Sequence, residues 1–279
     1  MLSISSKSRM SFFTTNVVSF IPLLDLKFNF LSKRLSSMAL SFSLPNYTSI
    51  LIKGIDSEKL LQGQASCDLA QNREYFNGLF CDEKGYVITN AVILKKDFFS
   101  IIVKKNVSKV LMEELQKFAK FFDCEISEEN QDIYGVQDNN VFKKCLGKNH
   151  HQLTCLDWDI ETMKNFCFDI DEQSSNKFRV NEIGYKFEDY ISYDKGCYRG
   201  QEIIARLTYL GKKVKKAVVF DRALEFISDS SGKKIGKKIF ELRSEETNLS
   251  QFFVEENDYY HDGKIIIPTS SQWELNRDH

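Results

Sequence analysis

The octapeptide KGCYRGQE, residues 195–202, holds one cysteine between two cations and two glycines. Gly196 and Gly200 flank Cys197, and glycine permits the positive φ or close backbone approach that a tight turn needs. The run QEIIARLTYL begins inside the motif, carries apolar residues at helical spacing and is followed by a glycine. We therefore expect Cys197 on a turn that leads directly into a helix over residues 201–210.

The residues around Cys197 favour a reactive thiol. Lys195 and Arg199 flank it, and a helix N-terminus carries partial positive charge, so the local potential favours thiolate. Glu202 is placed to satisfy free N–H groups of the first turn or to hold Lys195, while Gln201 can donate and accept. A plainer interpretation stays open, in which Cys197 is a small buried filler at the start of a helix.

Length and composition limit the number of domains, the classes of partner and the roles of the cysteines. A chain of 279 residues suggests two or three domains, since domains hold roughly 100–200 residues each. The net charge of -1 excludes a global attraction to phosphate polymers or anionic lipid. Seven cysteines without a CxxC pair argue against a disulfide framework or a closed zinc site, and for a reducing compartment.

The first 37 residues are rich in serine and basic residues and contain one acid, Asp25, which is typical of an organelle transit peptide. The alternative is an upstream extension, translated in error or disordered, because Met38 follows. The apolar run at residues 17–24 is far shorter than the roughly 20 residues that a membrane span needs. We expect no transmembrane anchor.

Hydrophobic periodicity predicts an α+β fold for the first half of the chain. A turn, DEKG, separates two extended runs and so indicates a hairpin. The polar, acidic segment 127–140 is interpreted as a loop between two halves. The predicted strands are 50–52, 75–80, 86–94 and 98–103, and the predicted helices are 58–62 and 107–122.

Short apolar runs separated by turn-like polar stretches follow residue 211 and favour a small all-β barrel or sandwich. The pair His150 and His151, with Cys145 and Cys155 nearby, lacks the spacing of a dedicated metal site. We interpret this region as a polar loop and predict no metal centre.

The octapeptide, with IIAR and the basic LGKKVKK after it, resembles the signature of the YgfZ-type family. These are folate-binding iron-sulfur assembly factors related to the glycine-cleavage T-protein. IKGIDSEKLLQGQASCDLAQ, residues 52–71, and CDEKGYVITNAVIL, residues 81–94, resemble the family's opening strand and helix and its first hairpin. The three blocks occur in the family's order.

The resemblance implies an aminomethyltransferase-like folate-binding α+β fold around a central opening, closed by a small C-terminal β-barrel. The expected segments are 1–37 as an extension or targeting-like segment, 38–126 as a first α+β domain, 127–211 as a second α+β domain with the motif, and 212–279 as the barrel.

The implied function is that of an accessory protein for iron-sulfur cluster assembly or repair, supporting iron-sulfur and tRNA-modifying enzymes. Cys197 would be the functional thiol, with Lys195 and Glu202 beside it. The implied cofactor is tetrahydrofolate or a derivative, with transient iron-sulfur cluster contact, and the partners are the assembly machinery and its client enzymes. The implied cofactor-binding residues are Tyr47, Tyr198, Gly196, Gly200, Gln201 and Arg206.

Three further expectations stay open. Tyr47 could stack on a pterin or simply pack in the core. The continuation after the motif resembles bacterial members and favours the cytoplasm, whereas a transit peptide would favour the mitochondrial matrix. The basic run Lys212, Lys213, Lys215 and Lys216 could attract a folate tail or RNA phosphates, or could be a solvated strand edge.

Two rival functions stand beside the accessory role. One is a folate-dependent one-carbon transferase; the other is an RNA-binding scaffold that uses the lysine run. Thr89 and Asn90 stand where aminomethyltransferases have a pair of aspartates, and neither side chain can act as a carboxylate base. We therefore do not expect aminomethyltransferase activity.

Overall fold

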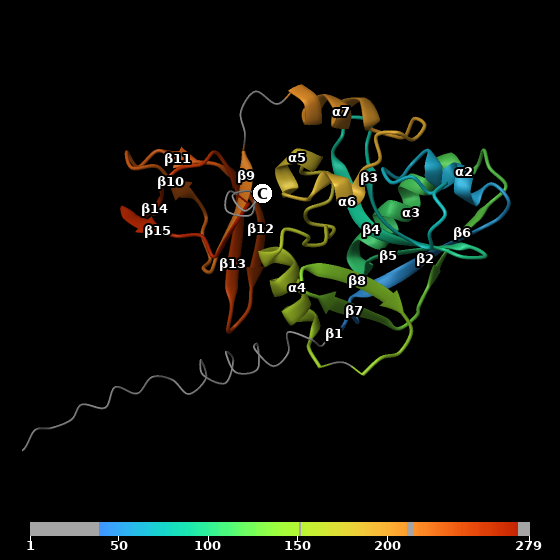
Figure 1. Ribbon diagram of the computed structural model, residues 1–279, viewed down its shortest axis with the longest axis horizontal. Helices are drawn as coiled ribbons and strands as arrows, with labels where there is room; N and C mark the ends of the chain where they lie inside the picture. Colours follow the sequence, from blue (N-terminus) through green and yellow to red (C-terminus); the bar gives the residue numbers. More distant parts are fainter. Residues whose placement is uncertain (1–38, 151, 211–214, 273–279) are drawn as a thin grey trace, which may run out of the picture. The chain divides into compact units, whose positions relative to one another are not determined.

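The computed structural model describes residues 39–150, 152–210 and 215–272, and it combines helices with antiparallel sheets (Figure 1). Several predictions fall outside these residues: the whole extension 1–37, His151, and Lys212 and Lys213 of the basic run.

A five-stranded antiparallel sheet forms the first half of the described chain. The predicted hairpin is present, with Phe76 opposite Ile93, and the predicted third strand pairs beside it. The strands follow the order β3-β4-β5-β2-β6. Their bounds are β2 Tyr47–Lys53, β3 Tyr75–Cys81, β4 Val87–Lys95, β5 Phe99–Lys104 and β6 Glu125–Glu129.

Two helices accompany this sheet, α2 (Ser57–Gln62) and α3 (Lys105–Ala119), and both were predicted. Val107, Leu111 and Leu115 recur at four-residue intervals on α3 and are buried in one core with apolar residues of the sheet. This amphipathic stripe fixes α3 on the sheet.

A second, three-stranded sheet packs with helix α4 around Trp158. The indole meets Phe42 edge-on at 5.4 Å between centroids and Phe142 at 5.6 Å. Gly135 lies directly against it, since a Cβ there would come within 2.4 Å of the ring. The elements are β1 Leu40–Ser43, β7 Ile133–Asp138, β8 Val141–Leu146 and α4 Cys155–Lys164, with sheet order β1-β7-β8.

The prediction of a loop over residues 127–140 is wrong, because most of β6 and all of β7 lie there. β6 is an edge strand on which Glu125 and Glu128 are exposed and Glu129 is half-buried, so its polar composition reflects its place at the edge of the sheet. Along β7, Ile133 and Gly135 are buried between more exposed neighbours, the two-residue period of a strand with one covered face.

Three short helices follow α4 and surround the largest core cluster. That cluster joins the β3–β4 hairpin to residues 163–204 and to the C-terminal strands. The helix predicted after the motif is confirmed as α7. The bounds are α5 Val180–Ile183, α6 Phe187–Tyr190 and α7 Gln201–Leu210.

The C-terminal strands form two four-stranded sheets, β12-β13-β9-β16 and β11-β10-β14-β15, in the described residues. On β9, Ala217 and Val219 belong to one core and Val218 and Phe220 to another, so both faces are covered. The predicted strands are therefore present, but a closed barrel is not confirmed. The bounds are β9 Lys216–Phe220, β10 Ile227–Ser228, β11 Lys234–Ile235, β12 Lys237–Arg243, β13 Asn248–Val254, β14 Tyr259–His261, β15 Lys264–Ile266 and β16 Ser270–Ser271.

Among the residues that the structure describes, no helix combines the length and the apolar character required to cross a membrane.

Candidate functional site

Cys197 lies on an irregular segment between α6 and α7, residues 191–200, which we call the motif loop. All seven cysteines are free; Cys197 is exposed, whereas the other six are buried or half-buried. The predicted turn before a helix is confirmed, and Cys197 is not a buried filler. Its thiol is available to a molecule that approaches from outside.

Lys195 turns into the protein instead of toward solvent. Its Nζ donates to the carbonyl oxygens of Ala65 at 2.8 Å and Cys67 at 2.7 Å, and only 8% of the residue is exposed. Burial lowers the pKa of Lys195 to about 8, against the opposing influence of Cys67 and Asp68. The ammonium thus ties the motif loop to the segment that follows α2.

Arg199 is likewise engaged away from the thiol. Its guanidinium donates to Glu114 on α3 at 2.8 Å and to Glu83 in the hairpin turn at 2.8 Å, and its backbone N–H donates to Gly63 at 3.0 Å. Both cations that the sequence placed around Cys197 therefore have partners elsewhere, and their contribution here is to hold the loop.

The two motif glycines differ. Gly200 has φ of +83°, and a Cβ there would come within 2.7 Å of the carbonyl oxygen of Asp82. Gly196 has no such φ, and a Cβ there would meet nothing within 4 Å. Only Gly200 is required by the conformation and by the close approach of α7 to the hairpin turn.

The remaining motif side chains shape the start of α7. Tyr198 is buried, and its N–H donates to Oε1 of Gln201 at 3.3 Å. Glu202 accepts from Arg206 at 3.1 Å on the exposed side of the helix, so the expectation that Glu202 holds Lys195 is wrong. Gln201 closes the turn, whereas Glu202 and Arg206 face solvent.

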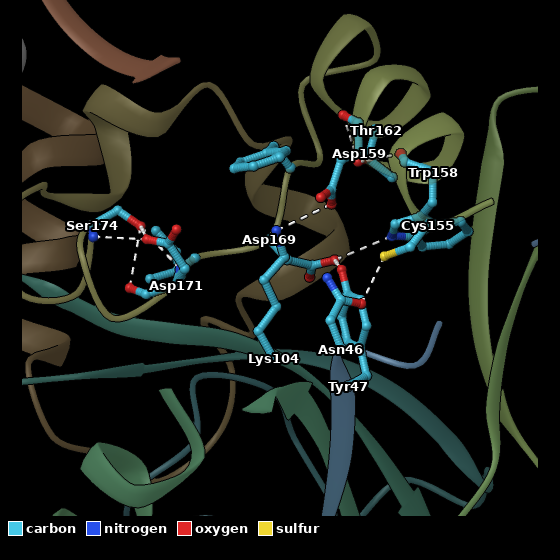
Figure 2. A network of polar contacts seen from close by, with 12 residues as sticks. Asn46, Tyr47, Lys104, Cys155, Trp158, Asp159, Thr162, Asp169, Asp171 and Ser174 are labelled. Atoms are coloured by element: carbon cyan, nitrogen blue, oxygen red, sulfur yellow. Dashed lines mark hydrogen bonds and ion pairs between the residues drawn. The ribbon is translucent and has the colours of Figure 1, made fainter. Parts of the chain in front are cut away.

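A second polar constellation lies in the interior, centred on Asp169 (Figure 2). Tyr47 Oη donates to Oδ2 of Asp169 at 2.6 Å, and Figure 2 shows the Trp158 indole reaching the same carboxylate. Lys144 Nζ donates to Oδ1 at 2.5 Å. Asp169 is 2% exposed, so this is a buried and ionised group with several donors.

Asn90 completes this constellation from β4. Its amide donates to Oδ1 of Asp169 at 2.7 Å, and its carbonyl oxygen accepts from the N–H of Ile170 at 2.8 Å. Thr89 instead donates to the carbonyl oxygen of Asn90 at 3.0 Å. Two positions singled out in sequence analysis, Tyr47 and Asn90, thus meet on one carboxylate.

A neighbouring ion pair adds a second buried acid. Lys104 Nζ lies 3.1 Å from Asp159, and 4.2 Å from the centroid of the Phe168 ring. Burial raises the pKa of Asp159 although Lys104 opposes the shift. For Asp169 the balance reverses: burial would raise its pKa, but Lys144 and Lys104 outweigh it and lower the pKa.

We call Tyr47, Asn90, Lys144, Trp158 and Asp169 the Asp169 network. Sequence reasoning found Tyr47 and Asn90 but missed the other three, which come from distant segments. One signal was available: the run FCFDI, residues 166–170, places a single acid among apolar residues. An acid in such a run is buried only when it has partners.

The polar and aromatic groups of the Asp169 network are of the types that could hold a folate. A pterin edge carries several N–H donors, and small-molecule sites combine aromatic walls with a few polar groups. Asp169 is a buried carboxylate beside the rings of Tyr47 and Trp158. Its oxygens already accept from protein donors, so a pterin held by Asp169, Tyr47 and Asn90 would replace some of them.

A cavity of about 380 Å³ adjoins this network at Tyr47, which lines it. Lys105 and Lys148 supply cations to its wall, where Asp132 lies 3.9 Å from Lys148 Nζ. No group of three metal-ligating side chains occurs among the described residues. Cys155, which follows the histidine pair in the sequence, donates to Oδ1 of Asn46 at 2.7 Å.

Comparison with known proteins places the chain in a family. No family model matches. A protein of Buchnera aphidicola named tRNA-modifying protein YgfZ is 30% identical, covering 60% of this chain and 68% of that protein. The protein of the same name from Escherichia coli O157:H7 is 26% identical, covering 61% and 68%.

The fold has a counterpart among solved structures. The glycine cleavage system aminomethyltransferase T from Bartonella henselae superposes with a TM-score of 0.66 at 12% identity, over 87% of this chain and 88% of that one. The described residues therefore adopt an aminomethyltransferase-like fold. The identity to the Buchnera protein, over two thirds of that relative's length, shows that this chain belongs to the YgfZ family.

Proposed function

We propose that this chain is an accessory factor for the assembly or repair of iron-sulfur clusters, and that it supports iron-sulfur enzymes, including enzymes that modify tRNA. The observation that carries the proposal is the exposed thiol of Cys197 on a loop held by its own cations. The names of the relatives, which are tRNA-modifying proteins, support the link to tRNA.

The test is complementation with Cys197→Ala. A bacterial strain that lacks its own YgfZ protein would receive the wild-type chain or the variant, and the level of a tRNA modification made by an iron-sulfur enzyme would be measured. We expect the variant to lose most of the rescue. Its stability should change by less than about 0.5 kcal/mol, because the side chain is exposed.

Cys124→Ala is the matched control, since Cys124 is a half-buried cysteine outside the motif. This variant should rescue as well as the wild-type chain does. Full rescue by Cys197→Ala would remove the thiol from the proposed function.

We further propose that tetrahydrofolate binds at the Asp169 network. Tyr47, which the resemblance associates with folate, and Asn90, at the position of an aminomethyltransferase aspartate, both contact Asp169. Lys105 and Lys148 in the adjoining cavity suit the carboxylates of a glutamate tail. Bound folate would supply a reduced pterin to the interior, while Cys197 would remain the group that meets the client.

One-carbon transfer is the weaker alternative. A general base needs a pKa near the working pH. Lys144 and Lys104 lower the pKa of Asp169 even against burial, and Lys144 donates to its carboxylate. These contacts favour a carboxylate that binds over one that abstracts a proton.

A further inference from the structure

Lys195 is a buried cation whose hydrogen bonds go to main-chain oxygens. The carbonyls of Ala65 and Cys67 accept from its Nζ, and the Tyr198 ring centroid lies 5.1 Å from the same atom. A charge taken out of water needs several good partners to be tolerated. The two carbonyl oxygens and the π face of Tyr198 supply these partners. Together they form a cation-binding site that the ammonium of Lys195 occupies.

The acceptors of Lys195 belong to a segment that contacts the motif loop at further points. Residues 63–67, which we call the anchor segment, accept the N–H of Arg199 at Gly63 and the N–H of Ser192 at Ser66, both at 3.0 Å. Ser66 Oγ also donates to the carbonyl oxygen of Tyr190 at 2.7 Å. The loop is therefore attached at its start, in the middle and at its end.

We infer that Lys195 is the positioning residue of the motif: its ammonium locks the motif loop onto the anchor segment and so fixes the place from which Cys197 meets a client. The inference rests on the proposed role of that thiol. Lys195 lies two residues before Cys197, and its ammonium donates to two carbonyl oxygens of the anchor segment. It acts through the loop without touching the reacting sulfur.

The test uses Lys195→Met in the full chain, because methionine keeps an unbranched stem and removes the ammonium. Hydrogen-deuterium exchange at Ser192 and Arg199 would be followed, together with iodoacetamide alkylation of Cys197 and rescue in the complementation assay. We expect exchange at both amides to rise about ten-fold or more, because the loop opens locally. Alkylation should persist while rescue is lost.

Lys95→Met is the matched control. Lys95 donates to the carbonyl oxygen of Leu69 at 2.8 Å and pairs with Glu58 at 2.7 Å, so it also holds a main-chain oxygen, but one outside the anchor segment. This variant should leave exchange in the motif loop unchanged.

Unchanged exchange at Ser192 and Arg199 in Lys195→Met would overturn the inference, whether or not the variant rescues the strain. Raised exchange with full rescue would overturn it too, because the position of the loop would then not matter. If Cys197→Ala rescues, the proposed function fails while the exchange result still reports whether Lys195 holds the loop.

A measurement on the wild-type protein covers the case in which the methionine variant does not fold. Acetylation of lysines by a water-soluble ester, read by mass spectrometry, should modify Lys195 about ten-fold more slowly than the exposed Lys84, because labelling of a buried amine requires local opening. Equal rates would overturn the inference.

Discussion

Replacement of Asp169 by leucine is expected to lower the free energy of unfolding by about 3–5 kcal/mol, because a buried cation then loses its counter-ion. Lys144 has 8% of its side chain exposed and its Nζ is bound to Asp169, so it cannot reach water without rearrangement. Tyr47 and Asn90 would lose their acceptor at the same time. Urea unfolding measures the change.

The control is the double variant Asp169→Leu with Lys144→Met, which removes both charges. Replacing a buried ion pair by apolar residues of similar size is often neutral, so most of the lost stability should return. If the single and the double variants are equally unstable, the loss comes from packing and the electrostatic account of Asp169 is wrong.

The contribution of Asp169 to the free energy of unfolding should depend on pH in a defined direction. Because the folded-state pKa of Asp169 is lowered, its contribution is complete above the ordinary carboxyl pKa of about 3.9. The contribution is lost as the pH falls through the lowered folded-state pKa. Below that pH the difference in stability between wild type and Asp169→Leu should shrink.

Gly200→Ala is expected to lower the free energy of unfolding by about 2–4 kcal/mol, because alanine would have to adopt a left-handed conformation and its Cβ would clash with the backbone. The strain arises because φ is +83°, and the clash because the new Cβ would lie 2.7 Å from the carbonyl oxygen of Asp82. The hairpin turn and the start of α7 would have to separate, and the motif loop would move with them. Urea unfolding and the complementation assay should both report this.

Gly196→Ala is the matched control on the other side of Cys197. Its Cβ would meet nothing within 4 Å, so stability should change by less than about 0.5 kcal/mol. Equal losses for the two variants would show that the packing of Gly200 on the hairpin turn is not what fixes the motif.

The regular elements were predictable where periodicity was strong. The hairpin, α3 and α7 have apolar residues at strand or helix spacing, and each formed as predicted. The acidic edge strand β6 was missed because composition suggested a loop, whereas the decisive factor was which neighbour it pairs with. Barrel closure depends on the same non-local pairing, and the two C-terminal sheets could not be read from the runs alone.

The candidate site, like the fold, could be predicted from the sequence only in part. Local glycines and helix spacing predicted Cys197 on a turn before a helix, but side-chain direction reversed the role expected of Lys195 and Arg199. The Asp169 network could not be assembled from sequence, since Tyr47 and Asp169 are 122 residues apart. Only the acid in an apolar run indicated that a partner existed, without saying which one.

We propose that folate binds in the interior, at the Asp169 network, and that the exposed thiol of Cys197 acts from a separate part of this chain. Calorimetric titration of the full chain with reduced tetrahydrofolate tests it most directly, with wild type, Cys197→Ala and the double variant Asp169→Leu with Lys144→Met compared. We expect saturable one-site binding by the first two proteins and its loss in the third. Absence of binding by wild type, or equal binding by the double variant, would contradict it.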